Sequence, residues 1–185
     1  MGETFLLVDG ENIDATLGGS ILGRRPAPEE RPRWDRVSEY AGSAWQQPVR
    51  PLFFLNASGN VPMSFVQALQ AIDFRPVLLS GPSSVKVVDV AIKRTLTALA
   101  DREDGDAMLV SHDGDFAPEL EPLLDAGRRV GVVAFRELLS GALADLVGRG
   151  LEVIDLEDDV AAFTVSLPRL RVIAIDEFDP WTLLS

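Results

Sequence analysis

Acidic and amide side chains follow two apolar segments of this sequence at the point where each segment ends. The stretch FLLVDGENID runs from four apolar residues directly into Asp9, with Asn12 three positions later. The stretch AMLVSHDGDF likewise runs into Asp113 and Asp115. Carboxylates that crowd together repel one another and raise their pKa values. Such a group is expected where a bound divalent cation compensates the negative charge.

A third acidic residue is expected at the same place. Asp89 lies in the first turn of a helix predicted over residues 87–100, after the third predicted strand. Ligands of open α/β sheets bind outside the carboxyl ends of the strands, so Asp9, Asp89 and Asp113 are expected to meet there. Two or three aspartates suffice to bind Mg²⁺ or Mn²⁺, which would lower the pKa of a bound water and stabilise charge on a phosphodiester. Asn12 would orient the water or the phosphate without adding negative charge.

Each of these aspartates has a simpler interpretation as a helix cap. An aspartate after a strand often accepts hydrogen bonds from the first turn of the next helix, and Asp113 or Asp115 could cap the helix that begins near Pro118. For any one aspartate taken alone, the cap is the preferred interpretation. For Asp9, Asp89 and Asp113 taken together at one edge of a sheet, a metal site is preferred.

Short apolar segments and amphipathic segments alternate along the chain. Six segments have the composition of parallel strands that are covered on both faces: residues 5–8, 51–55, 75–80, 107–111, 130–135 and 151–156. Helices are expected between them, over residues 34–45, 62–72, 87–100, 118–127 and 137–147. This alternation predicts an α/β domain with a parallel sheet and right-handed crossovers.

Two segments depart from this pattern. Residues 18–33 are rich in Gly, Pro and Arg and are expected to form a long loop before the helix at 34–45. Residues 157–185 form an acidic extension to a domain of residues 1–156. Two apolar stretches of the extension, AAFTVSL and LRVIAID, are expected to pair as a β hairpin around Pro168. The hairpin would pack on its own domain or build a homodimer.

Composition and charge exclude several classes of protein. The 185 residues include no cysteine, which excludes disulfides and thiolate metal sites. The net charge of −12 argues against a broad basic surface for nucleic acid, so any such binding is expected to be local. The N-terminus lacks the basic region of a signal peptide, and no apolar stretch has membrane-spanning length. A cytoplasmic protein with no membrane partner is therefore expected.

The acidic motifs occur in a recognisable order. VDGEN, KVVDVAI and LVSHDGDF, followed by DAGRRVGVVAF, resemble the motifs of an NYN domain of the PIN-like nuclease superfamily over about residues 4–156. The Arg-rich loop and the Trp-rich first helix resemble bacterial, actinobacterial-type members. The resemblance implies a three-layer, doubly wound parallel sheet in the order 3-2-1-4-5. It also implies cleavage of RNA, often endonucleolytic, with Mg²⁺ or Mn²⁺ in an acidic pocket above strands 1 and 4.

The resemblance also assigns roles to individual residues. Those that match the catalytic positions of the family are Asp9, Asn12, Asp89, Asp113 and Asp115, and the metal-site ligands among them would be Asp9, Asp89 and Asp113. Two departures stand out. Lys93, Arg94 and Thr95 occupy the region where many members carry a further aspartate, so Lys93 either weakens metal binding or contacts a phosphate. His112 stands where a glycine is usual.

Basic residues beside these motifs are candidates for RNA binding. Lys86, Lys93 and Arg94 flank the expected pocket. Arg24 and Arg25 belong to the Arg-rich loop, whose arginines have two equally weighted interpretations: they grip phosphate, or they form salt bridges with the acidic extension or a partner subunit.

The remaining candidates have structural interpretations. His112 is interpreted as a turn residue rather than a general base, because metal-dependent hydrolysis needs no histidine. Ser111 has no identifiable acid–base partner and is expected to satisfy backbone groups. Trp34, Trp45 and Trp181 are expected to pack rather than to stack on bases.

Two functions from different classes remain. The first is a Mg²⁺- or Mn²⁺-dependent endoribonuclease, favoured because the five motif residues from Asp9 to Asp115 are all present. The second is a non-catalytic module that binds RNA or a protein, favoured by the change at residues 93–95 and by the negative charge. Cleavage of RNA that depends on the metal and on Asp9 and Asp113 would separate the two.

Overall fold

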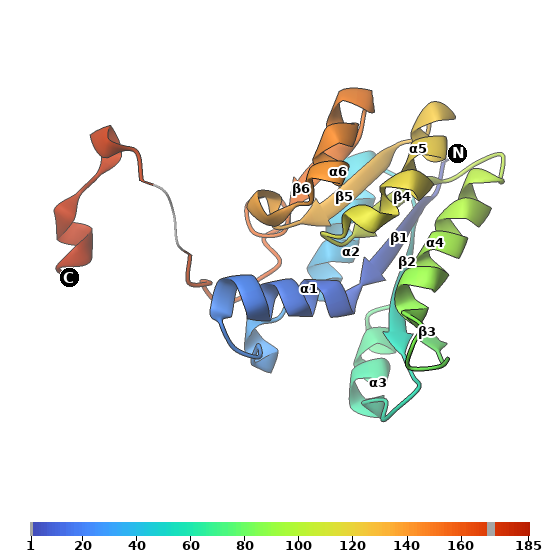
Figure 1. The fold of residues 1–185 in the computed structure, drawn as a ribbon, viewed down its shortest axis with the longest axis horizontal. Coiled ribbons are helices and arrows are strands. Elements are labelled where there is room, and N and C mark those ends of the chain that lie inside the picture. The colour runs from blue at the N-terminus through green and yellow to red at the C-terminus, as the bar shows by residue number, and fades with distance from the viewer. Residues whose placement is uncertain (1, 170–172) are drawn as a thin grey trace.

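A computed structural model describes residues 2–169 and 173–185. Its centre is a six-stranded sheet in the order β3-β2-β1-β4-β5-β6, in which every neighbouring pair is parallel (Figure 1). The strands are β1 Thr4–Asp9, β2 Val49–Asn56, β3 Arg75–Leu79, β4 Asp106–Val110, β5 Val130–Ala134 and β6 Glu152–Asp155. The predicted α/β class and the order 3-2-1-4-5 are confirmed, and β6 extends the sheet beyond β5.

The central strands are apolar throughout because both faces of the sheet are covered. Side chains alternate between the faces of a strand. In β1, Leu6 and Val8 therefore enter one hydrophobic core while Leu7 enters the other, and all three are fully buried. The uninterrupted apolar pattern of the sequence has this physical origin.

Helices cover the two faces and make three layers. One core is completed by α1 (Gly10–Thr16), α2 (Trp34–Trp45) and α3 (Met63–Ala71). The other is completed by α4 (Val87–Ala100), α5 (Ala117–Asp125) and α6 (Gly141–Ala144). No helix in the described ranges has both the length and the apolar character needed to cross a bilayer.

Two sequence expectations about helices are wrong. The loop expected from residue 18 begins as a helix, because α1 continues into a π-helical segment, Leu17–Leu22, before Gly23 ends it with a positive φ of 68°. The helix expected over residues 137–147 is broken, because Leu139 and Ser140 have extended backbones. The Ser140 side chain then caps the short α6 by accepting the N–H of Ala142.

Residues 157–169 of the extension pack on the domain without forming strands. Val160, Ala162 and Leu167 are buried in the core that also contains α2. At the start of α2, the Arg33 N–H donates to the Ala162 carbonyl at 2.7 Å. The expected hairpin is not found: 161–167 has no strand, and part of the second stretch, 170–172, lies outside the described residues. Backbone groups of this extension are satisfied by turns and by α2 instead of by a ladder.

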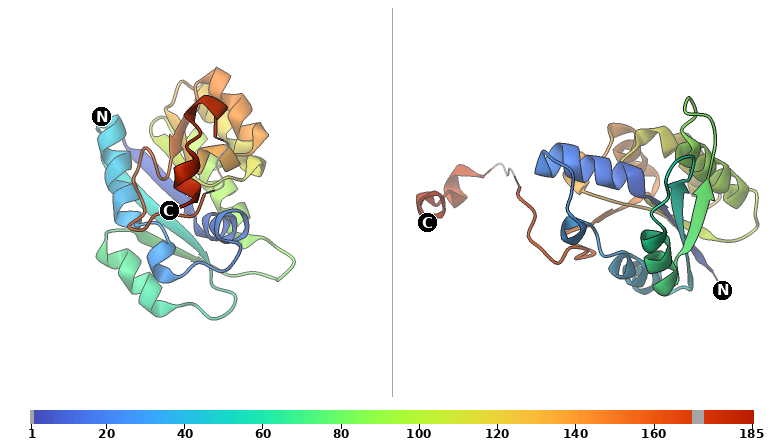
Figure 2. Two further views of the ribbon diagram at one scale, coloured as in Figure 1. Left: turned by 90° about the vertical axis from the view of Figure 1, so that its left-hand side faces the viewer. Right: turned by 90° about the horizontal axis from the view of Figure 1, so that it is seen from below.

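Residues 173–185 stand away from the domain. Both figures show this segment separated from the sheet and its helices, with two short 3₁₀ turns, Ile175–Glu177 and Pro180–Leu183 (Figures 1 and 2). Its large apolar side chains are exposed, including Ile175 at 87% and Trp181 at 74%. The homodimer expected through the extension stays a prediction, and these side chains are the surface that it would bury.

Candidate active site at the carboxyl ends of β1 and β4

A polar pocket lies where the order of the strands reverses. From β1 the chain builds the sheet outward to β3 on one side, and from β4 outward to β6 on the other. Ligands of such sheets bind at this switch point. The pocket has a volume of about 380 Å³, and its lining residues include Asp9, Asn12, Lys86, Asp89 and Asp113. The site residues predicted from three separate segments therefore meet in one cavity.

Asp9 is the buried carboxylate of this pocket. It is the last residue of β1, and its exposed fraction is 2%. Its Oδ2 accepts a hydrogen bond from Ser111 Oγ at 3.0 Å, and its Oδ1 accepts the N–H of Asn12 at 3.4 Å. Asp9 therefore caps α1 and also lines the pocket, so the helix-cap and pocket interpretations of this residue are compatible.

Gly10 allows α1 to start directly at this carboxylate. A Cβ at Gly10 would lie 2.5 Å from Cζ of Phe53, whose ring is buried and held by edge-to-face contacts with Trp34, Phe65 and Phe74. We expect Gly10→Ala to destabilise the fold by about 1–3 kcal/mol through overpacking. Urea denaturation measures the change.

A matched control for this prediction is Gly19→Ala. Gly19 is also helical, and a Cβ there would meet no atom within 4 Å. Its replacement is expected to leave the stability unchanged or to raise it by up to about 1 kcal/mol. Equal effects of the two substitutions would contradict the steric account of Gly10.

Burial and neighbouring negative charge raise the pKa of Asp9 and of Asp89. Burial raises the pKa of Asp9 to about 6; the hydrogen bonds from Ser111 and Asn12 oppose the rise, and the charge of Asp89 adds to it. The pKa of Asp89 is also raised, first by burial and then by the charge of Asp113, against the lowering effect of Lys86. A cation in the pocket would relieve both effects.

Asn12 is held by His112. Its Oδ1 accepts the backbone N–H of His112 at 2.8 Å and lies 3.1 Å from Nδ1 of the ring. His112 Nε2 accepts the N–H of Phe135 at 2.8 Å, so the proton of the neutral ring is on Nδ1 and is donated to Asn12. Burial lowers the pKa of His112 to about 4, against the opposing charge of Asp155. The imidazole is thus a structural donor and acceptor rather than a free base.

Asp113 and Asp115 differ in their positions. Asp113 lines the pocket, and its Oδ1 accepts the N–H of Asp115 at 2.9 Å as the cap of a 3₁₀ turn, Gly114–Phe116. Asp115 is exposed and is not among the residues that line the pocket. Ser111 satisfies polar groups, as expected: its Oγ donates to Asp9 and accepts the N–H of Asp113 at 3.2 Å.

The donor set suits a hard divalent cation. Four carboxylates line the pocket, those of Asp9, Glu11, Asp89 and Asp113, and oxygen is the ligand that Mg²⁺ and Mn²⁺ prefer. The pKa of Asp9 is raised mainly by burial and further by the charges of Asp89 and Glu11, and a bound cation would stabilise the ionised form against both effects. Within residues 2–169 and 173–185, no three acidic or histidine side chains are already spaced for direct ligation. Water would therefore complete the coordination, as is usual for Mg²⁺.

Basic residues flank one side of the pocket. Lys86 lines it, with a side chain that is 81% exposed and Nζ 3.9 Å from Asp89 Oδ2. Lys93 is half-buried on α4, and its charge acts on Asp89. Arg94 is exposed on the same helix and does not line the pocket.

The arginine-rich loop lies beside the acidic pocket rather than in it. Arg24 and Arg25 line a neighbouring cavity of about 600 Å³ that shares only Glu11 with the acidic pocket. Arg24 is bound through both terminal nitrogens to Glu30, at 2.8 and 2.6 Å. The other ion pairs of the loop are Arg31 with Asp14 and Arg33 with Asp35. Local acids, rather than the extension, thus take the ion pairs of these arginines.

Sequence reasoning missed several pocket residues. Asn56 ends β2 and Ser83 follows β3, and both line the pocket beside Lys86. Glu11 also lines it. A polar residue directly after a parallel strand is the signal that could have found Asn56, by the reasoning that found Asp9.

Comparisons with known proteins agree with this geometry. Among solved structures, the chain is similar to VPA0982 from Vibrio parahaemolyticus RIMD 2210633, a protein of unknown function, with a TM-score of 0.66 and 20% identity over 85% of this chain and 94% of that one. At this identity the likeness shows the fold alone. No curated protein matches the chain. The sequence matches the NYN domain over residues 3–149, a range that contains all the acidic motifs. The chain therefore belongs to the NYN domain family of PIN-like nucleases.

Proposed function

We propose that the protein is a metal-dependent endoribonuclease. The observation that carries this proposal is the buried carboxylate of Asp9, whose pKa is raised to about 6 and which shares a pocket with Asp89 and Asp113. An ionised buried carboxylate costs stability, and strongly perturbed pKa values cluster at functional sites. Its position at the switch point of an NYN domain supports phosphodiester hydrolysis as that function.

Each residue of the pocket has a role in the proposed reaction. Asp9, Asp89 and Asp113 would hold Mg²⁺ or Mn²⁺ through their carboxylate oxygens. When bound, the ion would lower the pKa of a water and stabilise the negative charge of the phosphodiester. Asn12 would donate from its side-chain amide to a phosphate oxygen. Asp115 would reinforce the negative potential, which also acts on Asp89.

RNA is the proposed partner, bound through a few cations rather than a broad surface. Lys86 is exposed at the pocket and would pair with the phosphate beside the scissile bond. Lys93 and Arg94, which lie on α4, would contact further phosphates of the RNA. Arg24 and Arg25 would contact the strand farther away, over the neighbouring cavity.

The proposal predicts cleavage that depends on both the metal and the pocket. Purified protein is incubated with single-stranded and structured RNA labelled at one end, in Mn²⁺, in Mg²⁺ or in EDTA. We expect internal cuts that EDTA abolishes. Asp113→Asn is expected to lower the rate at least about 100-fold, because a lost metal ligand removes electrostatic stabilisation of the transition state.

The matched control is Asp101→Asn. Asp101 is exposed at the far end of α4, and its replacement changes the charge by the same amount. It should cleave at the wild-type rate. Cutting that persists in Asp113→Asn would point to a contaminating nuclease, and absence of both cleavage and Mn²⁺ binding by calorimetry would reject the enzyme.

A second candidate is a non-catalytic module that binds RNA or a protein. The observation that favours it is the ion pair between Lys86 and Asp89, which offsets part of the negative charge of the pocket without a metal. In this case RNA would bind in EDTA as well as in Mn²⁺ and would remain intact. Lys86→Ala would weaken that binding, whereas Asp113→Asn would leave it unchanged.

A further inference from the structure

The side chain of Asn12 is fixed at one end and free at the other. Its Oδ1 is occupied by the backbone N–H and the ring Nδ1 of His112. Its Nδ2 makes no hydrogen bond to the described part of the chain, although Asn12 lines the pocket. The orientation set by His112 therefore leaves a donor group, rather than an acceptor, for a ligand of the pocket.

His112 is in turn held by Phe135, the residue that follows β5. The N–H of Phe135 donates to Nε2 at 2.8 Å, and the two rings stack with centroids 5.6 Å apart and planes at 16°. His112 is 6% exposed and Phe135 is fully buried. The imidazole can therefore rotate only if this stack is disrupted.

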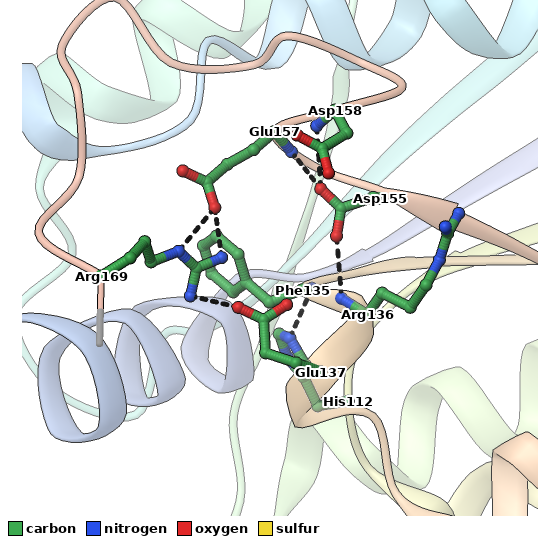
Figure 3. A network of polar contacts seen from close by, with 8 residues as sticks. All are labelled: His112, Phe135, Arg136, Glu137, Asp155, Glu157, Asp158 and Arg169. Atoms are coloured by element: carbon green, nitrogen blue, oxygen red, sulfur yellow. Dashed lines mark hydrogen bonds and ion pairs between the residues drawn. The ribbon is translucent and has the colours of Figure 1, made fainter. Parts of the chain in front are cut away.

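Two further contacts of the Phe135 ring come from the extension. Phe163 stacks on it with centroids 5.6 Å apart. The guanidinium carbon of Arg169 lies 4.8 Å from the ring centroid, and Figure 3 shows these two side chains together. The Arg169 side chain is only 13% exposed. It binds Glu137 through Nη1 at 2.5 Å and Glu157 through Nε at 2.7 Å. One arginine thus joins the segment after β5, the turn after β6 and the end of the extension.

We propose that Arg169 and His112 are positioning residues for the reaction at the acidic pocket. Arg169 holds Phe135, Phe135 holds the His112 ring, and His112 holds Asn12 with its amide donor facing the phosphate. Residues 157–169 of the extension then support the active site, although they lie beyond the family match at residues 3–149. This inference rests on the proposed ribonuclease function.

The first test compares Arg169→Ala with Arg149→Ala. Arg149 is a matched control, because it also pairs with two acids, Glu121 and Asp125, but it is not part of the stack. Both variants lose one positive charge. We expect Arg169→Ala to lower kcat about tenfold with little change in KM, since a small misplacement of a group that contacts the transition state acts on kcat. Arg149→Ala should stay at the wild-type kcat.

The second test separates positioning from stability at His112. Glutamine can supply an acceptor near the Nε2 position for the Phe135 N–H but no donor at Nδ1, whereas asparagine can supply a donor near Nδ1 but no acceptor at Nε2. We expect His112→Gln to be the more stable variant and His112→Asn to have the higher kcat, both measured well below the melting temperature. If kcat follows stability in the pair, the role of His112 is structural and the inference is overturned.

A readout independent of cleavage keeps the two proposals distinct. The side-chain amide signals of Asn12 in ¹⁵N-labelled protein report its orientation directly. We expect them to shift in Arg169→Ala and in His112→Gln, but not in Arg149→Ala. Unchanged signals in the first two variants would overturn the positioning role even if the wild type cleaves RNA. Shifted signals in a protein that cleaves no RNA would support the link and reject the ribonuclease.

Discussion

Asp9→Asn is expected to make the protein more stable in EDTA at pH 7.5 while reducing RNA cleavage to background. The carboxylate is 2% exposed, and its pKa is raised from 3.8 to about 6, mainly by burial. A rise of about two units corresponds to about 3 kcal/mol of lost stability when the group is ionised. Asparagine keeps only one of the two acceptor oxygens used by Asn12 and Ser111, so the expected gain is about 1–3 kcal/mol.

The gain should depend on pH in a defined direction. Because the folded-state pKa of Asp9 is the higher one, its ionisation penalty is absent below about pH 3.8, grows as the pH rises and is complete above about 6. His112 acts differently: its folded pKa of about 4 lies below the ordinary 6.5, so its contribution is full above 6.5 and is lost as the pH falls toward 4. Both proteins contain His112, so their difference isolates Asp9.

Urea denaturation of both proteins between pH 4 and pH 8 measures this difference. The two curves should converge near pH 4, separate as the pH rises toward 6 and keep a constant difference above about pH 6. Mn²⁺ should stabilise the wild type more than the variant, because ligand binding to the native state adds to its stability. The prediction that ionised Asp9 destabilises the fold would be refuted by a variant that is less stable than the wild type at pH 7.5. A stability difference that does not vary with pH would refute it as well.

The fold could be predicted from the sequence because local and global preferences agree. Strands such as residues 5–8 are apolar on both faces, and α4 has its apolar residues at helical spacing and lies over the predicted range, 87–100. The expectations failed where tertiary contacts decide the backbone. Residues 18–22 belong by composition to a predicted loop, but Ile21 and Leu22 pack against the core and a helix delivers them there. The hairpin at 161–167 failed for a related reason, since α2 and the core bury the same apolar side chains.

The acidic residues of the site were predictable from the sequence, but the contacts that link His112 to Arg169 were not. Asp9, Asp89 and Asp113 each stand at a fixed place relative to a strand or helix end, and the topology of a parallel sheet brings such places together. The link from His112 to Arg169 joins residues 57 positions apart through one ring stack, and no local pattern encodes that contact. His112 differed from the family pattern, which marked the position without revealing its partner.

Asp155→Ala is the second substitution with a large expected effect, and it acts on the extension. Asp155 is the last residue of β6 and is 4% exposed, and Figure 3 shows its carboxylate among its hydrogen-bond partners. Its Oδ2 accepts the N–H of Arg136 at 2.9 Å, and its Oδ1 accepts those of Glu157 and Asp158, each at 2.8 Å. Alanine would leave these buried or half-buried donors unpaired, at a cost of about 3–5 kcal/mol.

The cost should depend on pH with the opposite sign to that of Asp9. Burial alone would raise the pKa of Asp155, but the three backbone donors and the charge of Arg136 outweigh it, and the pKa is lowered below 3.8. The contribution of the ionised carboxylate is therefore full above that value and is lost as the pH falls through the lowered pKa. Chemical denaturation at pH 7 and near pH 3 should show a large and then a reduced difference from the wild type.

Two further variants define the cause. Asp158→Ala removes an exposed carboxylate from the same turn and should change the stability by less than about 0.5 kcal/mol. Asp155→Asn keeps one acceptor and turns an N–H₂ group toward a donor, so its loss should fall between those of the other two. Because this turn holds Glu157 against Arg169, Asp155→Ala should also lower kcat at temperatures where it is folded. Full activity in folded Asp155→Ala would mean that the turn after β6 stabilises the domain without supporting the site.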